Sequence, residues 1–178
     1  MGTRVVEVAP GRYAAWRLRF DANNPGGLPQ RVVAVESFDA SPLAVLLIRR
    51  GGYAVGLADG DTLVSHKVGS RYVQSRTAAG GWSQQRYARR RGNQADALVE
   101  AVADHFVRIL AAGAAVGPPR ALFVGGDKAL VAEVLGEPRL SELVRLPVRT
   151  AYDLPDPNRR VLDEALTRAR AVRVTIEE

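Results

Sequence analysis

The stretch Ala95–Gly113, ADALVEAVADHFVRILAAG, carries the longest helical pattern in the chain. Its apolar residues recur every three or four positions, the spacing that places side chains on one face of an α-helix. That face consists of Ala95, Leu98, Val102, Phe106 and Ile109. We therefore expect a long helix that packs on a core, beginning near Ser83, a suitable N-cap residue, and ending near Gly113.

Short apolar runs bounded by glycine or proline surround this helix and predict strands. Before it we expect strands at residues 5–8, 31–38, 43–50, 53–58 and 61–68, a helix at 12–20, a hairpin turn at Gly51-Gly52, a break at Gly69-Ser70, and extended chain at 71–76. After it we expect strands at 121–124, 144–148 and 172–176, helices at 128–135 and 157–171, and a strand-to-helix turn at 125–128. Strands followed by strand–helix alternation predict an α/β fold with a mixed sheet flanked by helices.

Length and composition limit the class of protein. The 178 residues suit one main domain, and a linker at residues 23–29 divides an N-terminal extension, residues 1–30, from a domain of residues 31–178. The chain has no cysteine, which excludes disulfides and thiolate zinc sites. Because no apolar run approaches the length of a membrane span or of a secretory signal, we expect a cytoplasmic protein. We also expect it to be a monomer.

The positive charge is concentrated in one segment. Between Thr62 and Ala95 there is no Asp or Glu, while that segment holds seven of the chain's 25 basic residues. The remainder, with 18 basic and 19 acidic residues, is close to neutral. The seven residues are Lys67, Arg71, Arg76, Arg86, Arg89, Arg90 and Arg91. Such a patch fits either a solvated arginine-rich face or a polyanion, of which nucleic acid is the commonest.

The predicted helix projects these arginines in a definite direction. At about 100° per residue, Arg86, Arg89 and Arg90 point away from the apolar stripe, while Arg91 lies nearer its edge. Arginine pairs well with phosphate oxygens and also stacks on bases. Trp82, beside the glycines, either stacks on a base or packs back on the sheet.

Catalysis by the chain's own titratable groups has little support in the sequence. The two histidines, His66 and His105, have no metal-ligand spacing, and no G-x-S-x-G motif is present. Acids at predicted strand ends could supply a two-metal nuclease site, although such acids are usually turn residues. They are Glu36, Asp39, Asp59 and Asp61. We expect no metal and no cofactor.

The segment GGWSQQRY, Gly80–Tyr87, resembles the central domain of eukaryotic and archaeal class I release factors. In that domain GGQ and a small polar run precede an Arg-aromatic pair that opens a long helix. The glycines and Arg86-Tyr87 match, but Trp82 stands where the glutamine should be. The release-factor-like peptidyl-tRNA hydrolases of ribosome quality control have a looser G-x-x-Q pattern, which residues 81–84 satisfy. The chain is similar to the actinobacterial members over roughly residues 31–178.

This resemblance implies a ribonuclease-H-like α/β fold, of the release-factor central-domain type, without nuclease activity. It implies hydrolysis of the ester between nascent peptide and tRNA, with the ribosomal large subunit and peptidyl-tRNA as partners. The implied catalytic residues are Gln84, Gly80 and Gly81, with Gln85 as the fallback, and the seven basic residues and Trp82 would bind RNA. Because 178 residues leave no room for stop-codon-reading domains, we expect codon-independent release in ribosome rescue or quality control.

The resemblance also explains the uncharged tip. A probe that enters an RNA-walled centre must be narrow and free of negative charge, and Ala78–Gly81 provides a slim backbone. We expect residues 77–83 to be poorly ordered. Two other hypotheses remain open: a non-catalytic protein that binds RNA or ribosomes, and a metal-dependent nuclease of the ribonuclease-H type.

Overall fold

The structure is a computed structural model that describes residues 2–25, 30–38, 40–70 and 83–178, without the side chains of residues 83–93. Two compact units make up the chain. The smaller consists of Met1–Asp39 with Leu166–Glu178, and the larger of Ala40–Ala165. The sequence predicts a separate catalytic domain that begins at residue 31. The two compact units do not test this division of function, so it stays a prediction. No helix in the described part of the chain is long and apolar enough to cross a membrane.

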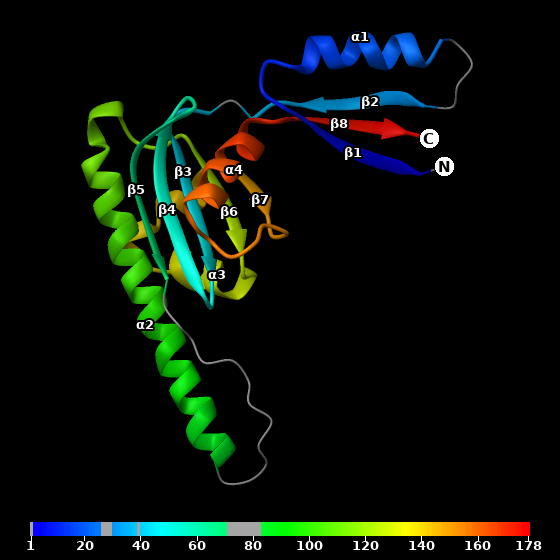
Figure 1. The fold of residues 1–178 in the computed structure, drawn as a ribbon. Helices are drawn as coiled ribbons and strands as arrows, with labels where there is room; N and C mark the ends of the chain where they lie inside the picture. Colours follow the sequence, from blue (N-terminus) through cyan, green and yellow to red (C-terminus); the bar gives the residue numbers. More distant parts are fainter. Residues whose placement is uncertain (1, 26–29, 39, 71–82) are drawn as a thin grey trace. The chain divides into compact units, whose positions relative to one another are not determined.

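A five-stranded mixed sheet forms the centre of the larger unit, in the order β5-β4-β3-β6-β7 (Figure 1). Strands β3, β4 and β5 are antiparallel neighbours, whereas β3, β6 and β7 run parallel. The predicted α/β fold with a mixed sheet flanked by helices is therefore confirmed. The bounds are β3 Leu43–Arg49, β4 Gly52–Asp59, β5 Thr62–Ser70, β6 Ala121–Gly126 and β7 Val148–Ala151.

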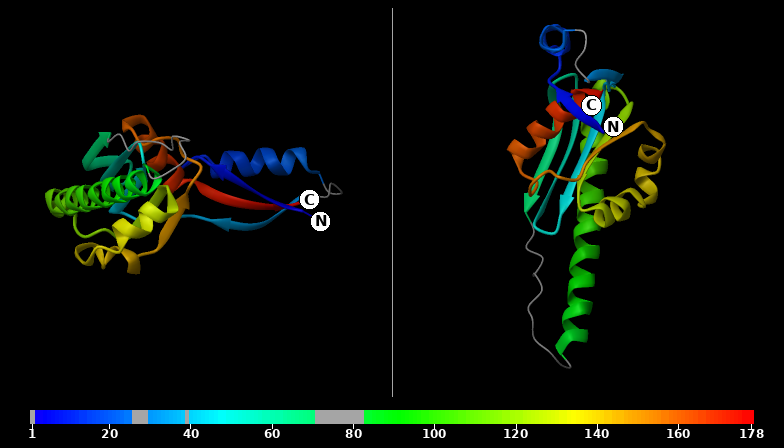
Figure 2. Two further views of the ribbon diagram at one scale, coloured as in Figure 1. Left: turned by 90° about the horizontal axis from the view of Figure 1, so that it is seen from below. Right: turned by 90° about the vertical axis from the view of Figure 1, so that its right-hand side faces the viewer.

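Helices cover both faces of this sheet, which explains why its central strands are apolar at nearly every position before their last residues, Arg49 and Asp59. Alternate residues of β3, Ala44, Leu46 and Ile48, belong to a core shared with α2 (Ser83–Ala112) and α3 (Lys128–Leu135). The intervening Val45 and Leu47 are buried as well. Figure 2 shows α4 (Arg159–Arg170) on the side of the sheet opposite α2 and α3.

Helix α2 packs through the apolar stripe that its sequence predicts. Leu98, Val102 and Phe106 are fully buried against β4, β5 and α3, and Ala95 and Ile109 pack beside them. The observed bounds agree with the predicted start near Ser83 and end near Gly113.

The connection from β6 to α3 is the predicted strand-to-helix turn. The Asp127 carboxylate accepts hydrogen bonds from the backbone N–H groups of Ala129 and Leu130, which caps the first turn of α3. Gly126, just before it, has a positive φ of 102°. A Cβ atom there would overlap the backbone oxygen of Ile48, so this position requires glycine for both its conformation and its space.

The smaller unit is a three-stranded antiparallel sheet, β1-β8-β2, with one helix. Its apolar face packs under an aromatic row on α1, in which Trp16 stacks between Tyr13 and Phe20. The central strand β8 comes from the C-terminal end of the chain, so the first and last segments fold together. The bounds are β1 Thr3–Val8, α1 Tyr13–Asn23, β2 Arg31–Glu36 and β8 Val172–Glu177.

Four local predictions are wrong. The expected strand at 144–148 is a 3₁₀ turn, Leu143–Arg145, and β7 begins only at Val148, after Pro147. The expected break at Gly69-Ser70 is absent, because both residues pair with the first residues of β4. The hairpin turn lies at Arg50-Gly51, since Arg49 already pairs with Gly52. The helix expected at 157–171 is α4, Arg159–Arg170. It begins two residues later than predicted because the side chain of Asn158 caps it by accepting a hydrogen bond from the N–H of Val161.

We expect Gly126→Ala to lower the free energy of unfolding by more than about 3 kcal/mol, because the added methyl group meets backbone in a conformation that suits glycine. Gly60→Ala is the matched control: Gly60 also has a positive φ, but nothing lies within 4 Å of a Cβ atom there. Its cost should be about 1 kcal/mol. Urea unfolding of both variants measures the difference, and equal losses would contradict the overlap.

Candidate functional site

The predicted site residues lie around one connection of the larger unit, from the end of β5 at Ser70 to the start of α2 at Ser83. Lys67 lies on β5 and is exposed. The first turns of α2 carry Gln84, Gln85, Arg86, Arg89, Arg90 and Arg91. Outside the described residues lie Arg71, Arg76, Gly80, Gly81 and Trp82, and with them the predicted extended chain at 71–76. Of the segment 77–83 that we predict to be poorly ordered, only Ser83 is described, and it begins α2. The structure thus places both ends of the predicted loop.

Helix α2 extends well past the part that packs on the core. Its 30 residues correspond to about 45 Å at 1.5 Å per residue. Ala95 is the first residue of α2 among the described side chains that packs in the core. The turns before it, about 18 Å of helix, carry the three arginines of the predicted basic face and Arg91. Figure 1 shows these N-terminal turns continuing past the end of the sheet.

The charge at the start of α2 suits an anion. The first turn holds no acid, and the first acid along the helix is Asp96. A helix N-terminus carries a partial positive charge and free N–H groups, so positive side chains there are unfavourable for the helix alone. Arg86 and Arg90 are also four residues apart, a spacing that places like charges beside each other. A bound polyanion would reverse both effects.

Strand β5 brings a further cation to the α2 side of the sheet. Lys67 pairs across the ladder with Val55, whose side chain belongs to the core under α2. Lys67 therefore points to the same side as that helix, as expected for neighbouring strand residues in register. Its exposure leaves the ammonium group free to contact solvent or a ligand.

A stacked pair fixes the position of α2 over β5. The imidazole of His105 lies on the Tyr53 ring, with centroids 5.6 Å apart and planes 17° apart. A Cβ atom on Gly69 would come within 2.5 Å of that ring, so the tyrosine rests directly over the end of β5. Burial lowers the pKa of His105, and nearby Arg108 and Lys67 lower it further. His105 is thus a neutral packing residue.

An ion-pair network adds a second anchor for α2. Arg139 Nη1 lies 2.7 Å from Asp104 Oδ1, and its Nε lies 2.8 Å from Glu137 Oε1. These two acids raise the pKa of Arg139. The side chains of Arg139 and Asp104 are both about half exposed, so their ion pair adds little to the free energy of unfolding. Its main effect is to orient the helix. Neither Arg139 nor Tyr53 shows a pattern in the sequence that would indicate this role.

Several of the histidines and acids considered for chemistry have structural partners. His66 lies against Arg159, with 2.8 Å between its Nε2 and the Arg159 Nη1. Asp59, at the end of β4, accepts a hydrogen bond at 2.6 Å from the hydroxyl of Ser41, which precedes β3. Among the residues that the structure describes, no three His, Asp or Glu side chains gather closely enough to hold a metal ion. Asp39 lies outside them.

Comparison with known proteins identifies the family. The model of the Actinobacteria/chloroflexi VLRF1 release factor family matches residues 41–175, most of the chain. The chain belongs to this family. The predicted resemblance to release factors is therefore confirmed.

One solved structure and one negative result complete the comparison. The crystal structure of an archaeal translation termination factor, aRF1, is similar with a TM-score of 0.43 and 17% sequence identity. The match covers 71% of this chain but 34% of the archaeal chain, so this VLRF1 chain spans about a third of that factor. No curated protein matches the sequence.

The histidine stack predicts a pH dependence of stability. An unfolded histidine binds a proton near pH 6.5, whereas folded His105 has a lower pKa, so below about pH 6.5 the unfolded state gains protons that the folded state lacks. Part of the free energy of unfolding is therefore lost as the pH falls. His105→Phe keeps a ring on Tyr53 without titrating. We expect it to lose less stability than the natural chain between pH 7.5 and 5.5 in urea unfolding, and equal losses would contradict this.

Proposed function

We propose that this chain is a ribosome-associated peptidyl-tRNA hydrolase, which releases the nascent peptide without reading a codon and acts in rescue or quality control of stalled ribosomes. The observation that carries the proposal is the family match, which spans both ends of the G-x-x-Q connection between β5 and α2. Its proposed partners are the RNA of the large subunit and peptidyl-tRNA, in the cytoplasm. No cofactor is needed for the reaction described below.

The charge distribution supports RNA as the partner. The segment from Thr62 to Ala95 is free of acids, and its basic residues stand on β5, on the first turns of α2 and on the connection between them. In this proposal Lys67 and the arginines of α2 bind phosphates around the entry to the reaction centre. Arg71, Arg76 and Trp82, on the connection itself, would contact RNA closer to the ester.

The proposed reaction is the attack of water on the ester carbonyl. The water oxygen bonds to the carbonyl carbon, and the bond from that carbon to the tRNA ribose oxygen breaks. One proton of the water ends on that ribose oxygen, and the other is released to solvent as the new carboxylic acid ionises. The products are a free peptide carboxylate, deacylated tRNA and one proton. RNA groups around the ester would carry the proton, since no titratable side chain of this chain is assigned to that step.

Gln84 is the proposed positioning group for the water. A glutamine amide does not titrate near neutral pH, so it is not a general base, but its oxygen and N–H groups can hold a water molecule in line with the carbonyl. Gly80 and Gly81 would let the backbone approach the ester closely, and a nearby backbone N–H would stabilise the developing oxyanion. Because Gln84 is the second residue of α2, the helix fixes the direction of its backbone.

A release assay tests the proposal. Purified large subunits or ribosomes that carry labelled peptidyl-tRNA are incubated with the full chain, with and without EDTA. Chelator-resistant release of peptide is the expected result. Binding without release would support the non-catalytic RNA-binding hypothesis instead, and metal-dependent cleavage of RNA would support a nuclease.

We expect Gln84→Ala to slow peptide release by roughly ten- to a thousandfold, the effect of losing one contact of about 1.4–4 kcal/mol in the transition state. Gln85→Ala, one residue further into α2, is the matched control and should do less. Ribosome binding should persist in both variants because the arginines are unchanged. The opposite order of effects would move the assignment to Gln85, and two active variants would refute the hydrolase mechanism.

We expect the triple change of Arg86, Arg89 and Arg90 to Ala to weaken ribosome binding. The slope of log binding constant against log salt concentration should fall by the contribution of about three phosphate contacts. A control that removes the same charge elsewhere in the larger unit changes Arg120, Arg145 and Arg160, which are exposed. Binding at several salt concentrations and thermal unfolding separate the two effects. Equal binding by both triple variants would show that net charge alone matters, and a large loss of thermal stability in the first would show that its arginines serve the fold.

A further inference from the structure

Two exposed cations of the larger unit, Lys67 on β5 and Arg108 on α2, lie near the stack of Tyr53 and His105. Among the residues that the structure describes, no acid forms an ion pair with either cation. Arg108 lies beyond the acid-free segment that ends at Ala95, so the charge distribution of the sequence does not indicate it. The structure brings it to Lys67 in the two steps that follow.

The ladder between β4 and β5 sets the position of Lys67. Lys67 is opposite Val55 and Gly69 is opposite Tyr53, and both β4 residues belong to the core under α2. Alternate residues of a strand lie on one face, so Lys67 is on the α2 side, about 7 Å before Gly69. The Tyr53 ring occupies the space over Gly69. Lys67 is therefore the next residue on that face of β5 beside the stack.

Helix α2 places Arg108 at the same level. Arg108 follows His105 by three residues, which is nearly one turn and about 4.5 Å along the helix axis. Strand β5 ends and α2 begins at the same end of the sheet, so the two elements run in opposite directions (Figure 1). A step back along β5 from Gly69 to Lys67 and a step forward along α2 from His105 to Arg108 therefore lead in the same direction from the stack.

The electrostatics of His105 agree with this placement. After burial, the charge of Arg108 and then that of Lys67 lower the pKa of His105, and the opposite effect of Asp104 is the smallest of the four. Asp104 is itself paired with Arg139 at 2.7 Å. The local charge beside the stack is therefore positive, and the described acid nearest to it already has a cation of its own.

Both cations have donors to spare. The Arg108 Nε donates a hydrogen bond to the backbone oxygen of Asp104 at 3.1 Å, which steadies the side chain along the helix. No described acceptor bonds to its other guanidinium nitrogens or to the Lys67 ammonium group. A guanidinium and an ammonium group on neighbouring elements, without an acid between them, suit the oxygens of one phosphate.

We propose that Lys67 and Arg108 together bind a phosphate group of an RNA backbone, where β5 and α2 lie side by side. The proposal rests on RNA as the partner in the proposed function, but not on ester hydrolysis. Arg108 follows Arg90 by 18 residues, about 27 Å along α2, so this contact is distinct from the arginines of the first turns. It extends the RNA-binding surface from those turns back to the sheet.

Equilibrium binding at several salt concentrations tests the proposal, with the full chain and two RNA probes: large ribosomal subunits free of tRNA, and deacylated tRNA. Lys67→Ala and Arg108→Ala should each weaken binding to at least one probe by roughly three- to tenfold and lower its salt slope by about one at most. The charge-preserving changes Lys67→Arg and Arg108→Lys should retain most of the binding. Loss with subunits alone assigns the phosphate to ribosomal RNA, and loss with tRNA assigns it to tRNA.

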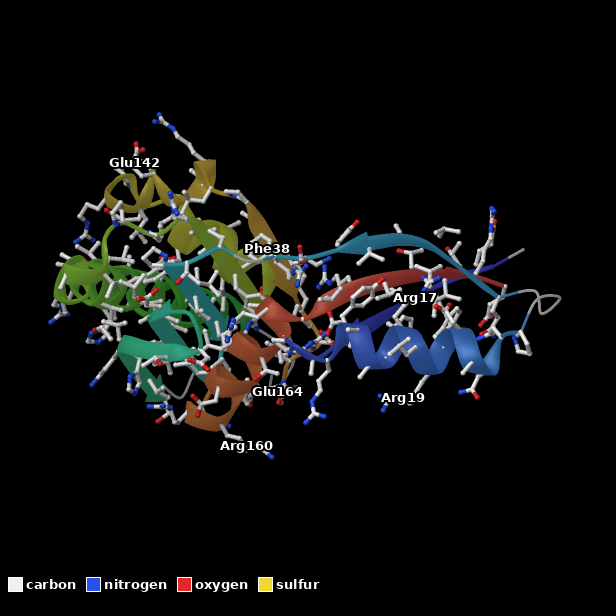
Figure 3. All side chains as sticks on the ribbon, turned by 90° about the horizontal axis from the view of Figure 1, so that it is seen from above. Arg17, Arg19, Phe38, Glu142, Arg160 and Glu164 are labelled. Atoms are coloured by element: carbon white, nitrogen blue, oxygen red, sulfur yellow. The ribbon has the colours of Figure 1, made fainter. Side chains whose placement is uncertain are left out.

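A matched control removes the same charge from exposed positions elsewhere in the larger unit. The double change of Arg120 and Arg160 to Ala is compared with the double change of Lys67 and Arg108 to Ala. Figure 3 shows the Arg160 side chain extending outward from α4, on the side of the sheet opposite α2. The control should change binding by less than about twofold. Because all four side chains are exposed, the thermal midpoint should move little in either variant.

Four results would overturn the proposal. They are no binding of the natural chain to either probe, unchanged binding of both single Ala variants, equal losses in the two double variants, and equal losses in the charge-preserving variants. Neither probe carries a peptide, so a chain that fails to release peptide leaves the binding result intact. A chain that releases peptide while its Lys67 and Arg108 variants bind normally would refute this contact alone.

Discussion

The packing of the α2 stripe on the sheet is the interaction on which the candidate site depends. Leu98, Val102 and Phe106 are fully buried, and each contributes about 1.5–3 kcal/mol by leaving water. Starting a helix is costly, whereas each further residue adds to it at little cost. Once the core fixes the C-terminal half of α2, the helix can continue into the arginine-rich turns before Ala95 at little further cost. Their positive charges near the helix N-terminus cost about 0.3–1 kcal/mol each at most, which the buried stripe offsets.

The sequence predicted those elements whose cause is local. The apolar stripe of α2 predicts where that helix begins and ends, and the Gly-Gly-Asp-Lys turn predicts the start of α3. The apolar runs predict every strand except β7. The prediction for β7 is wrong because LVRLPV contains as many apolar residues as a strand, whereas Leu143–Arg145 forms a 3₁₀ turn and Pro147 has no N–H to donate to a ladder, so strand pairing begins only at Val148. The predicted break at Gly69 is wrong for a different reason. That glycine makes room for the Tyr53 ring, which is a tertiary cause with no trace in the neighbouring residues.

The sequence also indicates only part of the candidate site. Its charge, its glycines and its glutamines lie together in the sequence, so composition and motif spacing could find them. The groups that hold its two ends are distant: Tyr53 reaches His105, and Asp104 reaches Arg139. Such pairs appear only when the chain has folded, because neither member belongs to a periodic pattern.

These distant contacts have a consequence for how the site works. Gly69 lies under the Tyr53 ring, and that ring lies under His105 of α2, so the end of β5 and the body of α2 are fixed to one another through a single stack. The connection that carries Gly80, Gly81 and Trp82 therefore leaves one end of a fixed frame and returns to the other. The packed sheet and helix thus fix the positions of both described ends of the connection, at Ser70 and Ser83.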